Sequence, residues 1–170
     1  MEEAGPSWGS DASWMRQALE EARRAADEGE VPVGCVMVLG DRVIGRGRNQ
    51  LEQLQDPTAH AEILAISAAA GTLGTWRLSD VVAYVTVEPC MMCLGAFHQA
   101  RVARLVYGAA EPKFGACGSR LDLTGALGLN HTLRIDRGVL AQEASDLLRQ
   151  FFRSLRRGAR AADSGGLENR

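Results

Sequence analysis

The sequence predicts an α/β fold: a three-layer sandwich in which helices cover a central mixed sheet of about five strands. Helical and strand-like segments alternate along the chain, as is typical of α/β proteins. Val81–Val87 is apolar almost throughout, which indicates a central strand covered on both faces. A chain of 170 residues is also long enough to form one domain with a substantial core.

The first half of the chain predicts a helix, a hairpin and a second helix. Asp11 or Ser10 can cap the first helix, and Gly29 ends it. Two strand-like runs then meet at Gly40-Asp41, a pair typical of a hairpin turn. These elements are a helix over 12–28, strands over 33–39 and 42–48, a loop over 49–58, and a helix from residue 59 or 60 to about 71–74.

The second half continues the alternation of strands and helices. The central strand leads directly into Glu88-Pro89-Cys90, after which a short helix is expected. The glycine-rich stretch over 108–124 is expected to form a loop near a functional site or a partner. The predicted elements are strands over 81–87, 104–107 and 132–135, and helices over 93–100 and 139–157.

We expect one folded domain over residues 11–158. A disordered N-terminus over 1–10 precedes it, and a flexible C-terminal tail over 159–170 follows it. No apolar run is long enough to cross a membrane, and the N-terminus lacks the features of a secretory signal. The four cysteines are therefore expected in the reducing cytoplasm, where C-x-x-C indicates metal binding or redox chemistry.

Two short motifs carry the predicted chemistry. His60-Ala61-Glu62 is followed by Pro89-Cys90-Met91-Met92-Cys93. One imidazole and two thiolates are the three protein ligands that a catalytic zinc takes while keeping a fourth position open. A further carboxylate, Glu62, can move the protons of an attacking water. H-x-E followed by P-C-x-x-C is the pattern of zinc-dependent nucleobase deaminases. The motifs therefore predict one zinc per chain, with Glu62 as the catalytic residue.

Helix geometry restricts how these residues meet. Cys90 and Cys93 can lie on one side of a first helical turn, where the helix dipole favours thiolates. His60 and Glu62 would point about 200° apart on a regular helix. They can share a site only if His60 lies at the helix start, which the preceding Asp56-Pro57-Thr58 permits.

Other interpretations of the same residues remain open. A thioredoxin-like redox pair would explain the two cysteines but would leave His60 and Glu62 without a role. His60 alone could be a core or capping histidine. A purely structural zinc usually has four protein ligands, and the spacings of His98, Cys35 and Cys117 do not suit a fourth.

Charge is unevenly distributed along the chain, whose net charge is −2. Residues 1–100 carry seven basic and 14 acidic side chains, whereas residues 101–160 carry 11 and five. In the last predicted helix, Arg149, Arg153 and Arg156 lie nearly opposite an apolar stripe. Such a charged face is often merely solvated. With few acids among these arginines, the pattern favours contacts with nucleic-acid phosphates.

From about residue 11 to 157 the chain resembles the bacterial tRNA-specific adenosine deaminases of the cytidine-deaminase-like superfamily. The zinc motifs alone are shared with cytosine and guanine deaminases, and the last three motifs below narrow the resemblance. The matching motifs are Glu30-Val31-Pro32-Val33-Gly34, Gly45-x-Gly47-x-Asn49, residues 56–62, residues 84–90, Gly115-Ala116-x-Gly118-Ser119, Leu129-Asn130-His131 and Phe151-Phe152-Arg153.

The resemblance implies hydrolysis of the wobble adenosine to inosine in a tRNA anticodon stem-loop, by a homodimer whose partner chain helps form the RNA site. It implies that His60, Cys90 and Cys93 bind zinc and that Glu62 shuttles protons. It also implies that Asn49 contacts the flipped nucleotide and that Val33 lines the base pocket. On composition alone, the alternative that Asn49 is a simple turn residue after a strand stays open. The chain departs from the family's usual residues at Cys35, Cys117 and Glu111.

Three hypotheses follow: a tRNA adenosine deaminase, a deaminase of free bases or nucleosides such as cytosine or guanine, and a non-catalytic RNA-binding module with a structural zinc. Glu62 argues against the third, because a structural site has no use for it. The basic C-terminal helix argues against the second. The bulky residues of the short helix suggest a dimer interface close to the active site. These residues are Met92, Leu94, Phe97 and His98.

Overall fold

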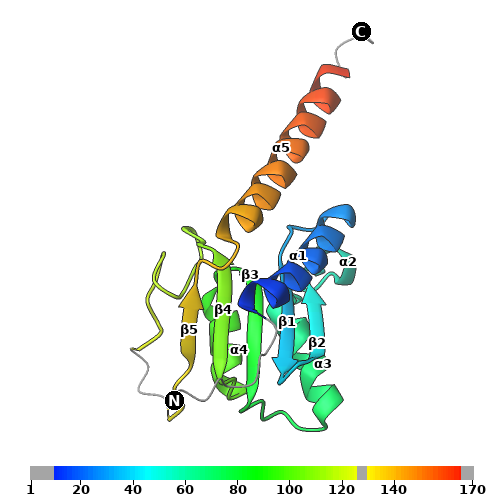
Figure 1. The fold of residues 1–170 in the computed structure, drawn as a ribbon. Coiled ribbons are helices and arrows are strands. Elements are labelled where there is room, and N and C mark those ends of the chain that lie inside the picture. The colour runs from blue at the N-terminus through cyan, green and yellow to red at the C-terminus, as the bar shows by residue number, and fades with distance from the viewer. Residues whose placement is uncertain (1–9, 126–129, 166–170) are drawn as a thin grey trace.

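The computed structural model describes residues 10–125 and 130–165, with side chains up to residue 159. The described chain forms the predicted three-layer sandwich around a five-stranded mixed sheet (Figure 1). The strands are β1 (Gly34–Leu39), β2 (Arg42–Arg48), β3 (Val81–Val87), β4 (Arg104–Ala109) and β5 (Arg134–Arg137). The helices are α1 (Asp11–Asp27), α2 (Leu51–Leu54), α3 (Ala61–Leu73), α4 (Met91–Gln99) and α5 (Ala141–Gly165).

The strand order in the sheet is β2-β1-β3-β4-β5. Strand β1 runs antiparallel to β2 and β3, whereas β3, β4 and β5 are parallel to one another. Helices α1 and α5 pack on one face, and α3 and α4 pack on the other (Figure 1). The prediction that residues 81–87 form a central strand is therefore confirmed.

The central strand is apolar on both faces because each face meets a helical layer. Ala83 and Val85 of β3 belong to the hydrophobic cluster beneath α3 and α4, whereas Tyr84 belongs to the cluster beneath α1. Successive side chains of a strand point to opposite faces, so both faces of β3 need apolar residues. The carboxyl end of β3 then delivers Cys90 to the start of α4.

Glycines in the strands let two helices lie unusually close to the sheet. A Cβ atom added at Gly47 of β2 would lie 2.1 Å from the carbonyl oxygen of Ala61, in the first turn of α3. One added at Gly34 of β1 would lie 2.0 Å from the carbonyl oxygen of Ala18 in α1. Both distances are impossible for a real side chain, so these two positions require glycine. Gly47 thereby fixes where the first turn of α3 lies.

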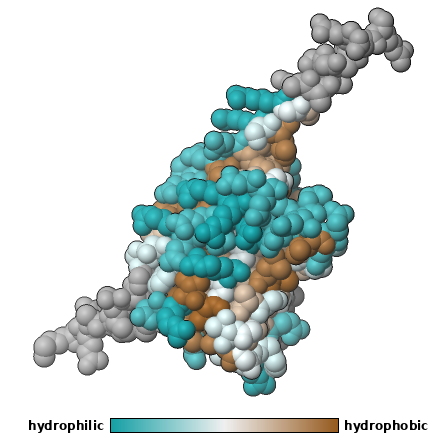
Figure 2. Space-filling view, turned by 90° about the vertical axis from the view of Figure 1, so that its right-hand side faces the viewer, coloured by the Kyte–Doolittle hydropathy of each residue, from teal (hydrophilic) through white to brown (hydrophobic). Residues whose placement is uncertain are grey.

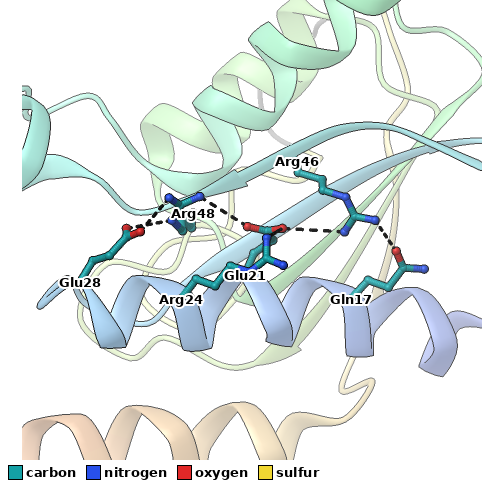
Figure 3. Close-up of polar contacts among 6 residues, drawn as sticks. All are labelled: Gln17, Glu21, Arg24, Glu28, Arg46 and Arg48. Carbon is teal, nitrogen blue, oxygen red and sulfur yellow. Dashed lines mark hydrogen bonds and ion pairs between the residues drawn. The ribbon is translucent and has the colours of Figure 1, made fainter.

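A buried carboxylate joins α1 to β2 (Figure 3). The side chain of Glu21 is 3% exposed, and arginine guanidinium groups approach it from both elements. Arg24 of α1 lies 3.1 Å away, whereas Arg46 and Arg48 of β2 lie 3.8 and 3.7 Å away. Arg48 also donates two hydrogen bonds to Glu28. The network fixes α1 against the sheet edge.

Several element boundaries differ from the sequence prediction. The loop over 49–58 contains the short helix α2, β4 extends to Ala109, and β5 lies two residues later than expected. Helix α5 continues to Gly165, into the segment predicted as a flexible tail. It projects from the body of the molecule (Figure 1). Of the two predicted termini, residues 1–9 and 166–170 lie outside the described residues, and Ser10 caps α1.

The projecting part of α5 is amphipathic but only partly covered. Ala144 and Phe151 are buried, whereas Phe152 and Leu155 are 41% and 51% exposed. Hydrophobic residues form a strip along this part of the helix in Figure 2, next to hydrophilic ones. Alanine and arginine are good helix formers, which accounts for a helix that continues beyond the sheet. Among the described residues, no helix combines the length and apolar character needed to cross a membrane.

Short helix α4 packs more deeply than the sequence suggested. Leu94 and Phe97 are 1% and 0% exposed and belong to the core cluster of their own chain. Leu94 and Phe97, which were expected to contribute to a dimer interface, therefore pack within their own chain. They fill the space between α3 and the strands.

Candidate metal centre and active site

Helix starts bring the predicted metal ligands together. His60 is the N-cap residue of α3, and its extended backbone (φ −72°, ψ 150°) takes it off the helix end, as the spacing to Glu62 required. Cys90 is the N-cap residue of α4, and Cys93 lies in the first turn of that helix. The ligand atoms of these three residues all lie within 4.8 Å of one another. Two segments 30 residues apart in the chain thus meet at one point.

The three side chains fit a tetrahedral zinc ion. The Nδ1 atom of His60 lies 3.8 Å from Sγ of Cys90 and 3.5 Å from Sγ of Cys93. Zn–N and Zn–S bonds of ordinary length at tetrahedral angles place the nitrogen and sulfur atoms about 3.6 Å apart. In the described part of the chain, no other group of His, Cys, Asp or Glu side chains has ligand spacing. The donor set leaves one tetrahedral position open.

The thiols affect each other's ionisation. The hydrogen bond between them lowers the pKa of Cys90 to about 4 and raises the pKa of Cys93 well above its usual value. The hydrogen bond to Cys90 raises the pKa of His60. These side chains therefore hold one negative charge readily and a second only with a cation between them. A divalent metal ion supplies that charge.

Glu62 lies in the first turn of α3 and is 4% exposed. Burial raises the pKa of Glu62 to about 7, because the charged carboxylate loses its hydration. A carboxyl group with a pKa near the working pH can both accept and donate a proton. Its place beside the ligand cluster follows from the close contact between Gly47 and the first turn of α3.

These residues surround a pocket of about 490 Å³, within the range of small-molecule sites. The lining residues are Val33, Asn49, His60, Glu62, Val87, Glu88, Cys90, Met91, Glu111 and Phe114. A larger pocket of about 710 Å³ lies next to α1 and contains none of the metal ligands. Chemistry rather than size therefore identifies the site.

Asn49 has a defined structural function. Its side-chain oxygen accepts a hydrogen bond from the Ala61 backbone N–H at 3.0 Å, and its Nδ2 donates to the Val31 carbonyl at 3.1 Å. Asn49 thus ties the end of β2 to the start of α3. The amide nitrogen carries two hydrogens, so one N–H remains after the bond to Val31, and Asn49 lines the pocket. Val33, which the resemblance predicts to line the base pocket, contributes to the wall of this pocket.

Glu88 organises another part of the pocket wall. The sequence interpretation did not single out this residue. It is 3% exposed, and its carboxylate accepts hydrogen bonds from the backbone N–H groups of Glu111, Cys117 and Ser119 at 3.0, 2.9 and 3.1 Å. Burial opposes ionisation, but these hydrogen bonds lower the pKa of Glu88 below its usual value. In the sequence, the signal for a functional role of Glu88 was its position as a charged residue directly after a buried apolar strand.

The predicted RNA-contact arginines lie beside this wall. Arg149, Arg153 and Arg156 line a third pocket, of about 440 Å³, together with Lys113. All three arginines are exposed, although Arg149 pairs with Asp146. The sequence did not single out Lys113, because only the fold places this residue next to α5.

Comparisons with known proteins agree with this geometry. The MafB19-like deaminase family matches residues 9–156. The tRNA-specific adenosine deaminase of Bacillus subtilis is 43% identical over 152 residues, 89% of this chain and 94% of that protein. The enzyme of the same name from Haemophilus influenzae is 46% identical over 147 residues, 86% of this chain and 85% of that protein.

Solved structures show the same fold. One, from a study of A-to-I editing by tRNA:A34 deaminases at the wobble position of transfer RNA, matches with a TM-score of 0.77 at 43% identity and covers 80% of this chain and 99% of that one. A guanine deaminase from Nitrosomonas europaea matches with a TM-score of 0.72 at 26% identity and covers 88% and 85%. The chain therefore belongs to the MafB19-like deaminases and, at 43–46% identity over most of its length, to the tRNA-specific adenosine deaminases.

Proposed function

We propose that this chain is a zinc-dependent deaminase that hydrolyses adenosine to inosine at the wobble position of a tRNA anticodon loop. The observation that carries the proposal is a buried carboxyl group, Glu62, beside a cluster of three candidate ligands in one pocket. Phe114 of this pocket is next in sequence to Lys113, which lines a basic pocket with three exposed arginines. A structural zinc would not explain Glu62, and a redox pair would not explain His60. The family membership supports the same reaction.

In the proposed reaction, each residue of the site has a separate function. His60, Cys90 and Cys93 would hold the zinc, which would supply the acidity that makes a water molecule nucleophilic near neutral pH. Glu62 accepts a proton from the attacking water and delivers it to ring nitrogen N1 as oxygen bonds to C6. Glu62 then assists proton transfer to the departing amino group, so that adenosine and water become inosine and ammonia. Asn49 positions the nucleotide with its free N–H, and Val33 contacts the base.

Lys113, Arg149, Arg153 and Arg156 are proposed to bind the phosphates of the loop. An anticodon loop offers unpaired bases that can enter a pocket, which a duplex does not. The basic side chains lie beside the pocket wall, where the phosphates next to an inserted nucleotide would pass. A site for free bases would not need them.

Inosine formation tests the proposal directly. The purified, zinc-loaded protein is incubated with an anticodon stem-loop that carries adenosine at the wobble position, with free adenosine, and with free guanine. A matched stem-loop with guanosine at that position is the control. We expect rapid conversion of the first RNA only. Faster turnover of guanine would support the free-base alternative, which the likeness to a guanine deaminase makes the relevant competitor.

We also infer that the protein is a homodimer and works in the cytoplasm. His98 of α4 is 8% exposed, yet neither ring nitrogen has a hydrogen-bond partner among the described residues. Met91, at the start of the same helix, is 59% exposed. A partner chain packed here would cover Met91 and meet His98 close to the active site. Light scattering should give twice the mass of one chain, and a monomeric mass would contradict the dimer.

The four free cysteines support the inference that the protein works in a reducing compartment such as the cytoplasm.

A further inference from the structure

Phe114 is a hydrophobic side chain at the mouth of the active-site pocket. It lines the pocket that contains His60 and Glu62, and it is 70% exposed. Isolated exposed hydrophobic residues are common on proteins and need no explanation by themselves. The position of Phe114, and the way its backbone is held, are what distinguish it.

The loop that carries Phe114 is fixed on both sides. Before it, the backbone N–H of Glu111 donates to Glu88, and that of Lys113 donates to the Glu111 side chain. After it, the backbone N–H of Gly115 donates to the Glu111 carbonyl and that of Ala116 to the Pro89 carbonyl. A Cβ atom added at Gly115 would lie 2.5 Å from the Glu88 carboxylate carbon. The aromatic ring is therefore presented by a backbone that is ordered before substrate binds.

Phe114 also lies between two sites that different parts of one strand of RNA would use. It contributes to the pocket with the metal ligands, whereas its neighbour Lys113 contributes to the basic pocket against α5. A strand whose adenosine enters the first pocket and whose phosphates reach the second must pass over this pair of residues. The nucleotide that passes over them is adjacent to the target.

We propose that Phe114 is the stacking site for the base adjacent to the target adenosine. The inference rests on the proposed function, because it requires a polynucleotide substrate. A base displaced from its own stack loses contact with its neighbours, and an aromatic ring on a fixed loop replaces that contact without being ordered first. Every base has a flat face, so the ring adds affinity with little discrimination between bases. Phe114 is therefore a substrate-binding residue that takes no part in proton transfer.

The test combines a side-chain change with a change in the RNA. Phe114→Ala and Phe114→Trp are compared with wild type in a Glu62→Gln background, in which binding is measured without turnover. Each protein binds stem-loops that carry an intact neighbour, or an abasic site on the 5′ or the 3′ side of the adenosine. Fluorescence anisotropy gives Kd. Trp76→Ala is the control, because Trp76 is 58% exposed and follows the end of α3 opposite His60.

We expect Phe114→Ala to weaken binding of the intact stem-loop on the order of 10-fold. Phe114→Trp and Trp76→Ala should keep wild-type affinity. An abasic site on one side should weaken binding of wild type to a similar extent and should add no further loss in Phe114→Ala, because both changes remove the same contact. The proposal is overturned if Phe114→Ala binds like wild type, or if both abasic penalties persist in it unchanged.

Further measurements separate this proposal from its premises. With Glu62 restored, wild-type protein must form inosine in the intact stem-loop; if it does not, the proposed function fails first. Zinc content and circular dichroism of Phe114→Ala should equal those of wild type, which excludes a disturbed loop as the cause. A 2-aminopurine base at the neighbouring position should be quenched on binding to wild type and less so on binding to Phe114→Ala.

Discussion

The proposed chemistry of this protein uses residues at the starts of two helices. His60 and Cys90 are N-cap residues, and Glu62 and Cys93 lie in the turns that follow. An N-cap side chain points off the helix end, whereas residues within the turn remain beside it. These two helix starts therefore bring the three candidate metal ligands and the proposed proton carrier into one small volume. The helix dipoles favour the negative charges gathered there.

Glu62→Gln should abolish most activity without removing the metal. The amide has nearly the same shape but cannot carry a proton between water and the base. The single-turnover rate on the stem-loop should fall by about 10²–10⁴-fold while zinc content stays at one per chain. Glu52→Gln, on the exposed surface of α2, should leave the rate unchanged. A Glu62→Gln rate close to that of wild type would remove Glu62 from the mechanism.

Cys90→Ala should remove zinc, whereas Cys35→Ala should not. Both cysteines are free, but only Cys90 has its sulfur beside His60 and Cys93. Two remaining ligands hold zinc far more weakly than three. Elemental analysis after dialysis against a mild chelator should find about one zinc per chain in wild type and Cys35→Ala. One zinc retained by Cys90→Ala would show that the ligand set has been assigned incorrectly.

At the scale of elements, the position of α1 depends on charge as well as apolar burial. Glu21 is buried between α1 and β2 with three arginines around it. Those arginines are 27–60% exposed, so water screens each pair, and the network is worth less than its contacts suggest. The side chain of Glu21 is only 3% exposed, so these arginines replace hydration that the carboxylate loses on burial.

Glu21→Ala should lower the free energy of unfolding by about 1–3 kcal/mol, because it leaves a small cavity and three neighbouring positive charges without their shared partner. Urea denaturation followed by circular dichroism measures the change. Glu20→Ala is the matched control, since Glu20 is the next residue of α1 and is exposed. Equal stability of the two variants would show that apolar contacts alone hold α1.

Across the whole molecule, an acidic chain presents a basic site. The excess of acidic residues lies in residues 1–100, and the excess of basic residues in residues 101–160. The fold places Lys113 from the loop after β4 and the arginines of α5 around the same pocket, next to the active-site wall. Anionic RNA can therefore be attracted to this region despite a net charge of −2.

Changing Arg149, Arg153 and Arg156 together to alanine should raise KM for the stem-loop with little effect on kcat. Each lost phosphate contact also lowers the salt dependence, so the slope of log KM against log salt should fall by about two. The control changes three exposed arginines outside these pockets, Arg16, Arg42 and Arg77, and alters net charge equally. Equal effects of the two triple variants would indicate general attraction rather than specific contacts.

The sequence by itself determined the chemistry and the layers. H-x-E and C-x-x-C place their residues within one helical turn, and a turn has the same geometry in any fold. The apolar run over 81–87 required cover on both faces, which fixed a three-layer arrangement. The need for His60 to lie at a helix start also followed from geometry alone, and the backbone of His60 agrees with it.

Only the tertiary structure decided which distant segments meet. Three features of the site bring together residues that are 23 or more positions apart. They are the backbone hydrogen bonds to Glu88, the contact of Lys113 with the pocket against α5, and the position of Phe114 in the same pocket as His60. Such contacts depend on strand order and on how closely helices approach the sheet, which local periodicity does not encode. The burial of Leu94 and Phe97, and the length of α5 beyond Arg157, were misjudged for that reason.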